Sequence, residues 1–178
     1  PTTLFRSDGG DTSGSVVTGF RKRSGFTGTC ALEIGDGTSR FRGNDLRDFV
    51  VDGGLEAGDG IRLKRLGSVV LSNLVIERND GWGILRDGVW TGKFEYLSVR
   101  LNGVTGQTTG GGIKDVFTGT TNPETSNCIQ TQCTVNGNFY RQWLVDSGDT
   151  LATTLTVGGL FEAGEDDVMP TVEIKTSD

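Results

Sequence analysis

Short strands with one apolar face recur along the chain at nearly constant spacing. Alternating apolar and polar residues, the pattern of a half-buried strand, occur at DFVVDG (48–53), NLVIER (73–78) and YLSVRL (96–101). A second signal, glycine before an apolar strand, occurs at DGIRLKRL (59–66), WGILRDG (82–88) and GGIKDVF (111–117). Both signals keep their order in each unit, and self-similarity at a fixed period is typical of a repeat architecture.

Each unit is too small to bury its own apolar face, but stacked units pair equivalent strands about 4.8 Å apart around a continuous interior. We therefore predict an all-β fold, a right-handed single-stranded parallel β-helix (a solenoid) of about six to seven coils with little or no α-helix. The predicted inward columns are Phe49, Leu74 and Leu97, then Val51, Ile76 and Val99, and on the second strand Ile61, Leu63, Ile84 and Ile113.

The whole chain, 1–178, is predicted to form one β-helix domain with its best-defined coils over 46–117. Loop-rich insertions are expected near 105–112 and 118–127, and the first is expected on an outer face as a binding loop. Residues 138–148 are the least regular part and predict either a strand with an aromatic face or a short helical turn. Strand-like sequence at both ends leads us to expect a segment of a longer polypeptide, or ends covered by neighbouring chains.

Composition narrows the class of protein. The chain has 29 glycines and three prolines among 178 residues, which disfavours long helices and favours short strands with tight turns. The net charge is −6, so nucleic acid is not an expected partner. Abundant Asp and scarce Lys resemble proteins of salt-loving, halophilic organisms, although an ordinary acidic β-protein remains an equal alternative. No signal peptide and no apolar run of membrane-spanning length are visible, so we expect no membrane insertion.

A family resemblance follows from TTLFRSDGG (2–10), LEIGDG (32–37), FRGNDLRDFVVDGG (41–54), GDGIRL (58–63) and VVLSNLVIERNDGWGI (69–84). Their order resembles the pectate-lyase-like parallel β-helix superfamily, and most of all its viral tailspike and virion surface domains. VGGLFEAG (157–164) is similar to a phrase common there. The resemblance covers about residues 1 to 165. It implies the fold and leaves activity open, because one fold hosts lyases, hydrolases, adhesins and inert spacers.

The absence of histidine excludes Ser-His-Asp and Cys-His nucleophile systems and most zinc sites. Paired carboxylates remain as candidates for glycoside hydrolysis, which needs two at about 5 Å or about 6.5–9.5 Å. Asp52 and Glu77 lie at equivalent strand ends, and Asp59 and Asp80 at nearly equivalent turns. The alternative for all four is a solvated turn, because Asp-Gly is a common turn pair.

The resemblance also implies a second catalytic type, the calcium-dependent lyases with an arginine or lysine base, for which Arg78, Arg86 and Lys114 are conceivable. No cofactor is expected, and calcium is the one metal that the composition allows. The calcium candidates are Asp8, Asp11, Asp166 and Asp167, for which plain surface acids are the alternative. Cys30, Cys128 and Cys133 are expected to be small buried hydrophobes, with a small Cys128–Cys133 loop as the alternative.

Aromatic residues provide candidates for carbohydrate binding, because rigid apolar rings stack on sugars. The candidates are Trp82, Trp90, Tyr140 and Trp143, with packing inside a coil or between subunits as the alternative.

From these features and the resemblance together, we expect a structural virion surface protein (tailspike, tail fibre or capsid turret). Its expected location is the virion surface or extracellular. Its expected partners are further copies in a homotrimer, other virion proteins and host surface polysaccharide or glycoprotein. The alternative is a polysaccharide lyase or glycoside hydrolase.

Overall fold

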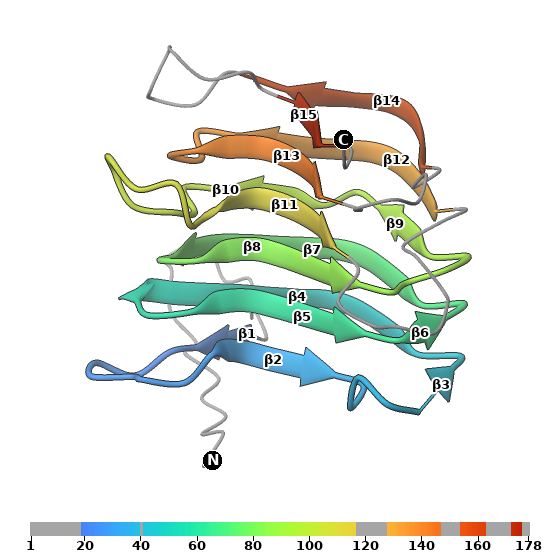
Figure 1. Cartoon of the computed structure of the whole chain (residues 1–178), viewed down its shortest axis with the longest axis horizontal. Helices are drawn as coiled ribbons and strands as arrows, with labels where there is room; N and C mark the ends of the chain where they lie inside the picture. Colours follow the sequence, from blue (N-terminus) through green and yellow to red (C-terminus); the bar gives the residue numbers. More distant parts are fainter. Residues whose placement is uncertain (1–18, 40, 117–127, 147–153, 163–171, 176–178) are drawn as a thin grey trace, which may run out of the picture.

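The chain folds as a stack of parallel strands, as seen in a computed structural model that describes residues 19–39, 41–116, 128–146, 154–162 and 172–175 (Figure 1). Sheet A contains β1 (Gly19–Arg21), β4 (Asp45–Glu56), β7 (Val70–Asn79), β9 (Lys93–Glu95), β10 (Ser98–Arg100), β12 (Cys128–Asn136) and β14 (Thr154–Phe161). Sheet B contains β2 (Cys30–Ile34), β5 (Asp59–Lys64), β8 (Trp82–Asp87), β11 (Gly111–Val116), β13 (Arg141–Asp146) and β15 (Val172–Lys175). Sheet C contains β3 (Phe41–Arg42) and β6 (Leu66–Gly67).

The predicted all-β parallel solenoid is confirmed. Every strand pair is parallel and joins one coil to the next, and none of the described residues is helical. The described strands complete about four turns from β4 to β13, fewer than the predicted six to seven coils. Strands β1–β3 and β14–β15 add a partly described layer at each end. The irregular segment 138–148 contains β13, so its strand alternative is the correct one.

The interior consists of apolar columns that run from coil to coil. Val51 is in register with Ile76, and Ile76 with Val99, and all three are fully buried. On sheet B the column Ile61, Ile84 and Ile113 is equally buried. These columns were predicted from the alternation of apolar and polar residues. Burial of such apolar side chains, at roughly 25 cal/mol per Å², is the main contribution to the stability of the stack.

A charged pair interrupts one apolar column of sheet B. Leu63 is in register with Arg86, and Arg86 with Asp115. Arg86 is 1% exposed and Asp115 is 0% exposed, and their side chains form two hydrogen bonds of 2.5 and 2.6 Å. The Arg86 guanidinium also lies 4.5 Å from the centre of the Phe94 ring. This ion pair therefore belongs to the core.

The repeated glycine–isoleucine signal has a packing reason. An added Cβ at Gly60 would lie 2.9 Å from Asn79 Nδ2, and at Gly83 it would lie 2.7 Å from Asn102 Nδ2. At Gly112 the same atom would lie 3.0 Å from Asn138 Nδ2. These three glycines leave room for asparagine side chains that turn inward. Glycine is required at these three positions because the asparagine side chains approach the backbone closely, and not because the backbone is left-handed.

Candidate functional site

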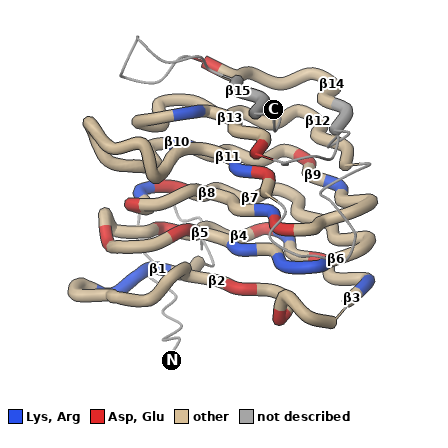
Figure 2. Tube along the Cα trace, viewed as in Figure 1, with Lys and Arg blue, Asp and Glu red and all other residues tan. Residues whose placement is uncertain are grey.

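The outer end of sheet A carries a line of charged residues from successive coils, and we take it as the candidate site. Arg21, Asp52, Glu77, Arg100 and Asn136 occupy the same position in five layers. This register confirms that Asp52 and Glu77 occupy equivalent positions, although β4 continues beyond Asp52 to Glu56. Parallel layers bring such side chains to about 4.8 Å spacing, and Figure 2 shows acidic and basic residues lying close together along the stack.

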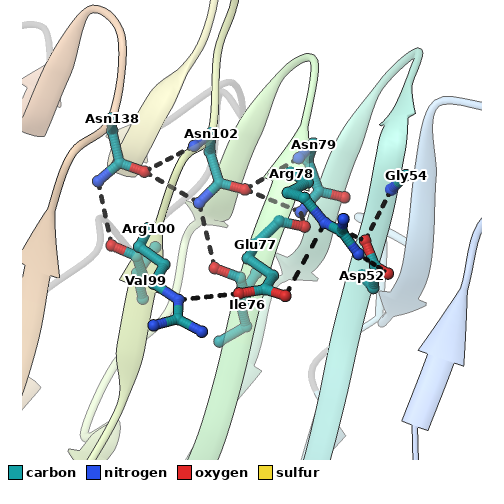
Figure 3. Close-up of polar contacts among 10 residues, drawn as sticks. All are labelled: Asp52, Gly54, Ile76, Glu77, Arg78, Asn79, Val99, Arg100, Asn102 and Asn138. Atoms are coloured by element: carbon teal, nitrogen blue, oxygen red, sulfur yellow. Dashed lines mark hydrogen bonds and ion pairs between the residues drawn. The ribbon is translucent and has the colours of Figure 1, made fainter. Parts of the chain in front are cut away.

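Arginines occupy the oxygens of both carboxylates (Figure 3). Asp52 pairs with Arg78 through two hydrogen bonds, from Nε at 3.0 Å and from Nη2, and with Arg21 at 3.3 Å. Glu77 accepts a bond of 2.8 Å from Arg100 Nε and lies 3.9 Å from Arg78. The hydrogen bond to Asp52 raises the pKa of Arg78. We call Arg21, Asp52, Glu77, Arg78 and Arg100 the arginine row.

The arginine row has the spacing of a hydrolase carboxylate pair without its accessibility. Retaining glycoside hydrolysis requires one carboxylate to attack a sugar and the other to donate a proton. The oxygens of Asp52 and Glu77 instead accept hydrogen bonds from guanidinium groups, and Gly54 N–H adds a further bond of 2.8 Å to Asp52. Charge-assisted bonds of this kind hold ionised carboxylates in place. The arrangement therefore favours joining coils over proton transfer.

Asp59 and Asp80 are not at equivalent positions. Asp59 is aligned with Trp82, because Ile61 pairs with Ile84. It is 4% exposed, pairs with Arg62 at 2.5 Å and accepts the Trp82 N–H at 2.7 Å. Asp80 is half-buried, and its N–H donates to Glu56 O at the preceding corner. The register therefore offsets the two residues by two positions in neighbouring coils.

An asparagine ladder at the corner between sheets A and B was not predicted from the sequence. Asn102 Oδ1 accepts bonds from Asn79 N and Nδ2, and Asn138 Oδ1 accepts the equivalent bonds from Asn102. All three side chains are fully buried, and Figure 3 shows them in a line. The ladder ends at Asn79, since Glu56 occupies the next position beyond an irregularity in register. The available signal was an asparagine at the end of β7 and two residues after the ends of β10 and β12.

The predicted aromatic residues are placed mainly against other side chains. Trp82 is 5% exposed and meets Tyr140 edge to face, with ring centres 6.2 Å apart. The Arg141 guanidinium covers Tyr140 at 4.2 Å. Trp143 donates to Asp115 at 2.8 Å and stacks on Phe161, and Trp90 packs over Gly67 of the neighbouring coil. The structure brings Trp82 and Tyr140 together; carbohydrate binding by these rings stays a prediction.

A different aromatic residue is open to solvent on sheet A. Asp48, Asn73, Tyr96 and Gln132 occupy one position in four successive layers, and each has a positive φ between 52° and 59°. All four are exposed, Tyr96 by 60%. Asn73 Nδ2 donates to Asp48 Oδ1 at 2.7 Å. We call these four residues the left-handed row. The row could not be predicted from the sequence, because residues other than glycine rarely adopt this conformation.

The remaining candidates divide into three groups. Arg86 is inside the core and cannot reach a bound polymer, while half-buried Lys114 pairs with Asp146 at 3.2 Å. Asp8, Asp11, Asp166 and Asp167 lie outside the described residues, and within the described part no cluster of three or more potential metal ligands occurs. Cys128 and Cys133 are buried free thiols, and burial raises the pKa of both. They are therefore unreactive core residues, as expected.

Comparisons with known proteins support the fold. No protein-family model and no curated protein matches the sequence. Among solved structures, ORF18 of Geobacillus virus E2 is similar, with a TM-score of 0.74 and 13% sequence identity over 91% of this chain. The match covers 34% of that protein, so the chain spans about a third of its length. No helix in the described ranges is long and apolar enough to cross a bilayer.

Proposed function

We propose that this chain is a structural solenoid segment of a virion protein. The observation that carries the proposal is that its polar side chains link coil to coil. The arginine row and the asparagine ladder both consist of contacts between neighbouring layers. The likeness to a phage protein supports a viral setting. A stack joined in this way provides a rigid rod, which is what a spike, fibre or turret requires.

Particle fractionation tests the proposal. Virus particles are purified from the source culture, and an antibody raised against the chain is applied for immuno-electron microscopy. Label on the particles is the expected result, and its position distinguishes tail from capsid. Label confined to the particle-free fraction contradicts a virion role. Sedimentation equilibrium of the purified protein tests the homotrimer that we include in this proposal.

Binding of a host surface polysaccharide is a second proposed function, favoured by the exposure of Tyr96 in the left-handed row. A carboxylate, two amides and a phenol at about 4.8 Å spacing offer the hydrogen-bond groups and the ring that sugars require. Isothermal titration with host polysaccharide is the test. Tyr96→Ala is expected to weaken binding at least about tenfold, whereas Leu55→Ala, which removes a side chain 64% exposed at another corner, leaves it unchanged. Equal binding by both variants contradicts a role for this row.

A hydrolase or lyase is the competing function. The same polysaccharide is incubated with the protein and assayed for reducing ends and unsaturated uronates. We expect no release, because guanidinium groups occupy the carboxylate oxygens of the arginine row. Release that Asp52→Asn or Glu77→Gln abolishes would establish an enzyme and remove the purely structural interpretation.

A further inference from the structure

The buried Arg86–Asp115 pair joins β8 to β11, a strand that follows a long connection. The corner before β5 is residues 57–58, and the corner before β8 is residues 80–81. Strand β11 is preceded by residues 101–110 and followed by residues 117–127. Short corners fix the position of β5 and β8 along their neighbours through the covalent chain. In the connection before β11, Asn102 and Gly103 are held by bonds to Asn138 and Asn79, and the residues that follow them are numerous enough to allow β11 a slide of two residues.

The alternation of inward and outward side chains does not by itself prevent such a slide. A shift of two residues keeps the same side chains facing inward, because side chains alternate with a period of two. The native register pairs Ile113 with Ile84 and Asp115 with Arg86. In the shifted register, Gly111 would face Ile84 and Ile113 would face Arg86. Gly110 would then occupy the crowded position of Gly112, which accepts only glycine because an added Cβ meets Asn138 and Val135.

The charged pair makes the shifted register unfavourable. The guanidinium of Arg86 and the carboxylate of Asp115 are almost inaccessible to solvent, and each is the other's charge partner. Trp143 of the next coil donates a further bond of 2.8 Å to Asp115. A slide would separate all three groups inside an apolar environment, where an uncompensated charge is strongly disfavoured.

We propose that the Arg86–Asp115–Trp143 contact is a register lock that fixes β11 between β8 and β13. The lock supplies a position that the long connection before β11 does not. It predicts that removal of both charges lowers the cost of the shifted register, in which the remaining penalty is the loss of the Ile113–Ile84 contact. Buried polar groups specify register in the same way at single positions of coiled coils.

Disulfide trapping on the outer face distinguishes the two registers. Asp87 is the register partner of Val116, and parallel neighbours at about 4.8 Å are within disulfide reach. In the shifted register Asp87 would face Lys114, which in the native register is about 8 Å away and out of reach. The pair Asp87→Cys with Val116→Cys reports the native register, and Asp87→Cys with Lys114→Cys reports the shifted one. Cys30 is replaced by alanine, because it is the half-buried native thiol.

Each pair is placed in the native core and in the Arg86→Leu/Asp115→Leu core, oxidised mildly and analysed by peptide mass spectrometry. The native core is expected to form the 87–116 disulfide alone. In the Leu/Leu core the 87–114 disulfide is expected to rise at least about tenfold. The Ile61→Val/Ile84→Val variant is the matched control, because it changes a neighbouring apolar column without removing charge, and it should behave as the native core does.

A Leu/Leu protein that folds and forms only the 87–116 disulfide overturns the proposal. Should the Leu/Leu protein not fold, deletion of residues 104–109 is the second variant, because it shortens the connection before β11. If the shortened Leu/Leu protein folds, the first variant failed because β11 had lost its register, which supports the proposal. If it still does not fold, the proposal of a register lock is overturned.

Discussion

The interior and the outer end of the stack use the same chemistry under opposite conditions. Asp115 and Asp52 each accept two hydrogen bonds from an arginine of a neighbouring coil. The Arg86–Asp115 pair is sealed in the core, whereas Arg78 is 40% exposed beside Asp52. In the interior a missing partner leaves a charge without solvent, and at the surface water replaces the partner. The hydrogen-bond geometry of the two pairs therefore does not tell which contributes more to stability. The difference in burial does.

The largest expected effect is that of Asp115→Asn. This change keeps the volume of the side chain but removes the charge opposite Arg86, so an uncompensated guanidinium remains in the core. We expect the free energy of unfolding to fall by about 3–5 kcal/mol. Urea denaturation followed by circular dichroism measures it. A loss below about 1 kcal/mol is typical of surface ion pairs and would contradict the conclusion that burial makes this pair more important for stability.

Asn102→Ala is expected to have the next largest effect. It removes the acceptor for Asn79 N and Nδ2 and the donor to Ile76 O, all within the buried corner. Orphaned buried groups cost about 1–3 kcal/mol each, and we expect a total loss of about 3 kcal/mol. Asn136→Ala is the matched control, because the bond from its side chain to Glu162 is exposed, and the expected change is below about 0.5 kcal/mol. Equal losses from the two variants would contradict a buried ladder.

Lys22 is another buried charged residue, and it gives a pH-dependent effect. Its ammonium donates to Glu56 O, Ala57 O and Gly58 O at 3.4, 3.0 and 2.7 Å, and the residue is 5% exposed. Burial lowers the pKa of Lys22 to about 8 from 10.5. Between these values the unfolded chain holds one proton more than the folded chain at this residue. The Lys22 contribution to the free energy of unfolding therefore rises with pH across this window, by about 2–3 kcal/mol.

The measurement is the slope of unfolding free energy against pH from 8 to 10.5 for native protein and Lys22→Met. Subtraction is needed because burial also raises the pKa values of Cys30, Cys128 and Cys133. Thiols that stay protonated in the folded state lower stability as pH rises. The native slope is expected to be the more positive one. Identical slopes in the two proteins would show that Lys22 keeps its ordinary pKa in the folded state.

Asp52→Asn should have the smallest effect of the series. The exposed Arg78 and Arg21 remain solvated after the change, so we expect a loss of about 1 kcal/mol or less. Added salt should reduce the difference from native protein further, because screening weakens surface pairs. Thermal unfolding at low and high ionic strength measures both quantities. A salt-independent loss as large as that of Asp115→Asn would refute the distinction between the outer end and the interior.

Much of the fold could be predicted because one physical rule governs its most regular part. Alternation placed Val51, Ile76 and Val99 in one buried column and brought Asp52 beside Glu77. The same rule places Arg86 two residues after Ile84, on the inward side of its strand. A charged residue is rarely buried without a partner. The partner, Asp115, is 29 residues away, and only the three-dimensional register connects the two.

The candidate site was less predictable, because its features depend on backbone conformation and on pairing between coils. Asp59 and Asp80 both precede glycine, but a register difference separates them. The neutralisation of Asp52 and Glu77 requires Arg78 and Arg100 to fold back across neighbouring layers. The left-handed row requires φ values that sequence does not encode for Tyr96 or Gln132.

The left-handed row has a consequence for how such a surface can change over generations. Its backbone conformation repeats while its side chains differ, from carboxylate to amide to phenol, and Gly158 continues the position in the next layer with φ 58°. The side chains at this position face solvent, so the core places no demand on their chemistry. Mutations can therefore change the exposed side chains of the left-handed row one layer at a time. The buried core and the backbone of the solenoid need not change with them.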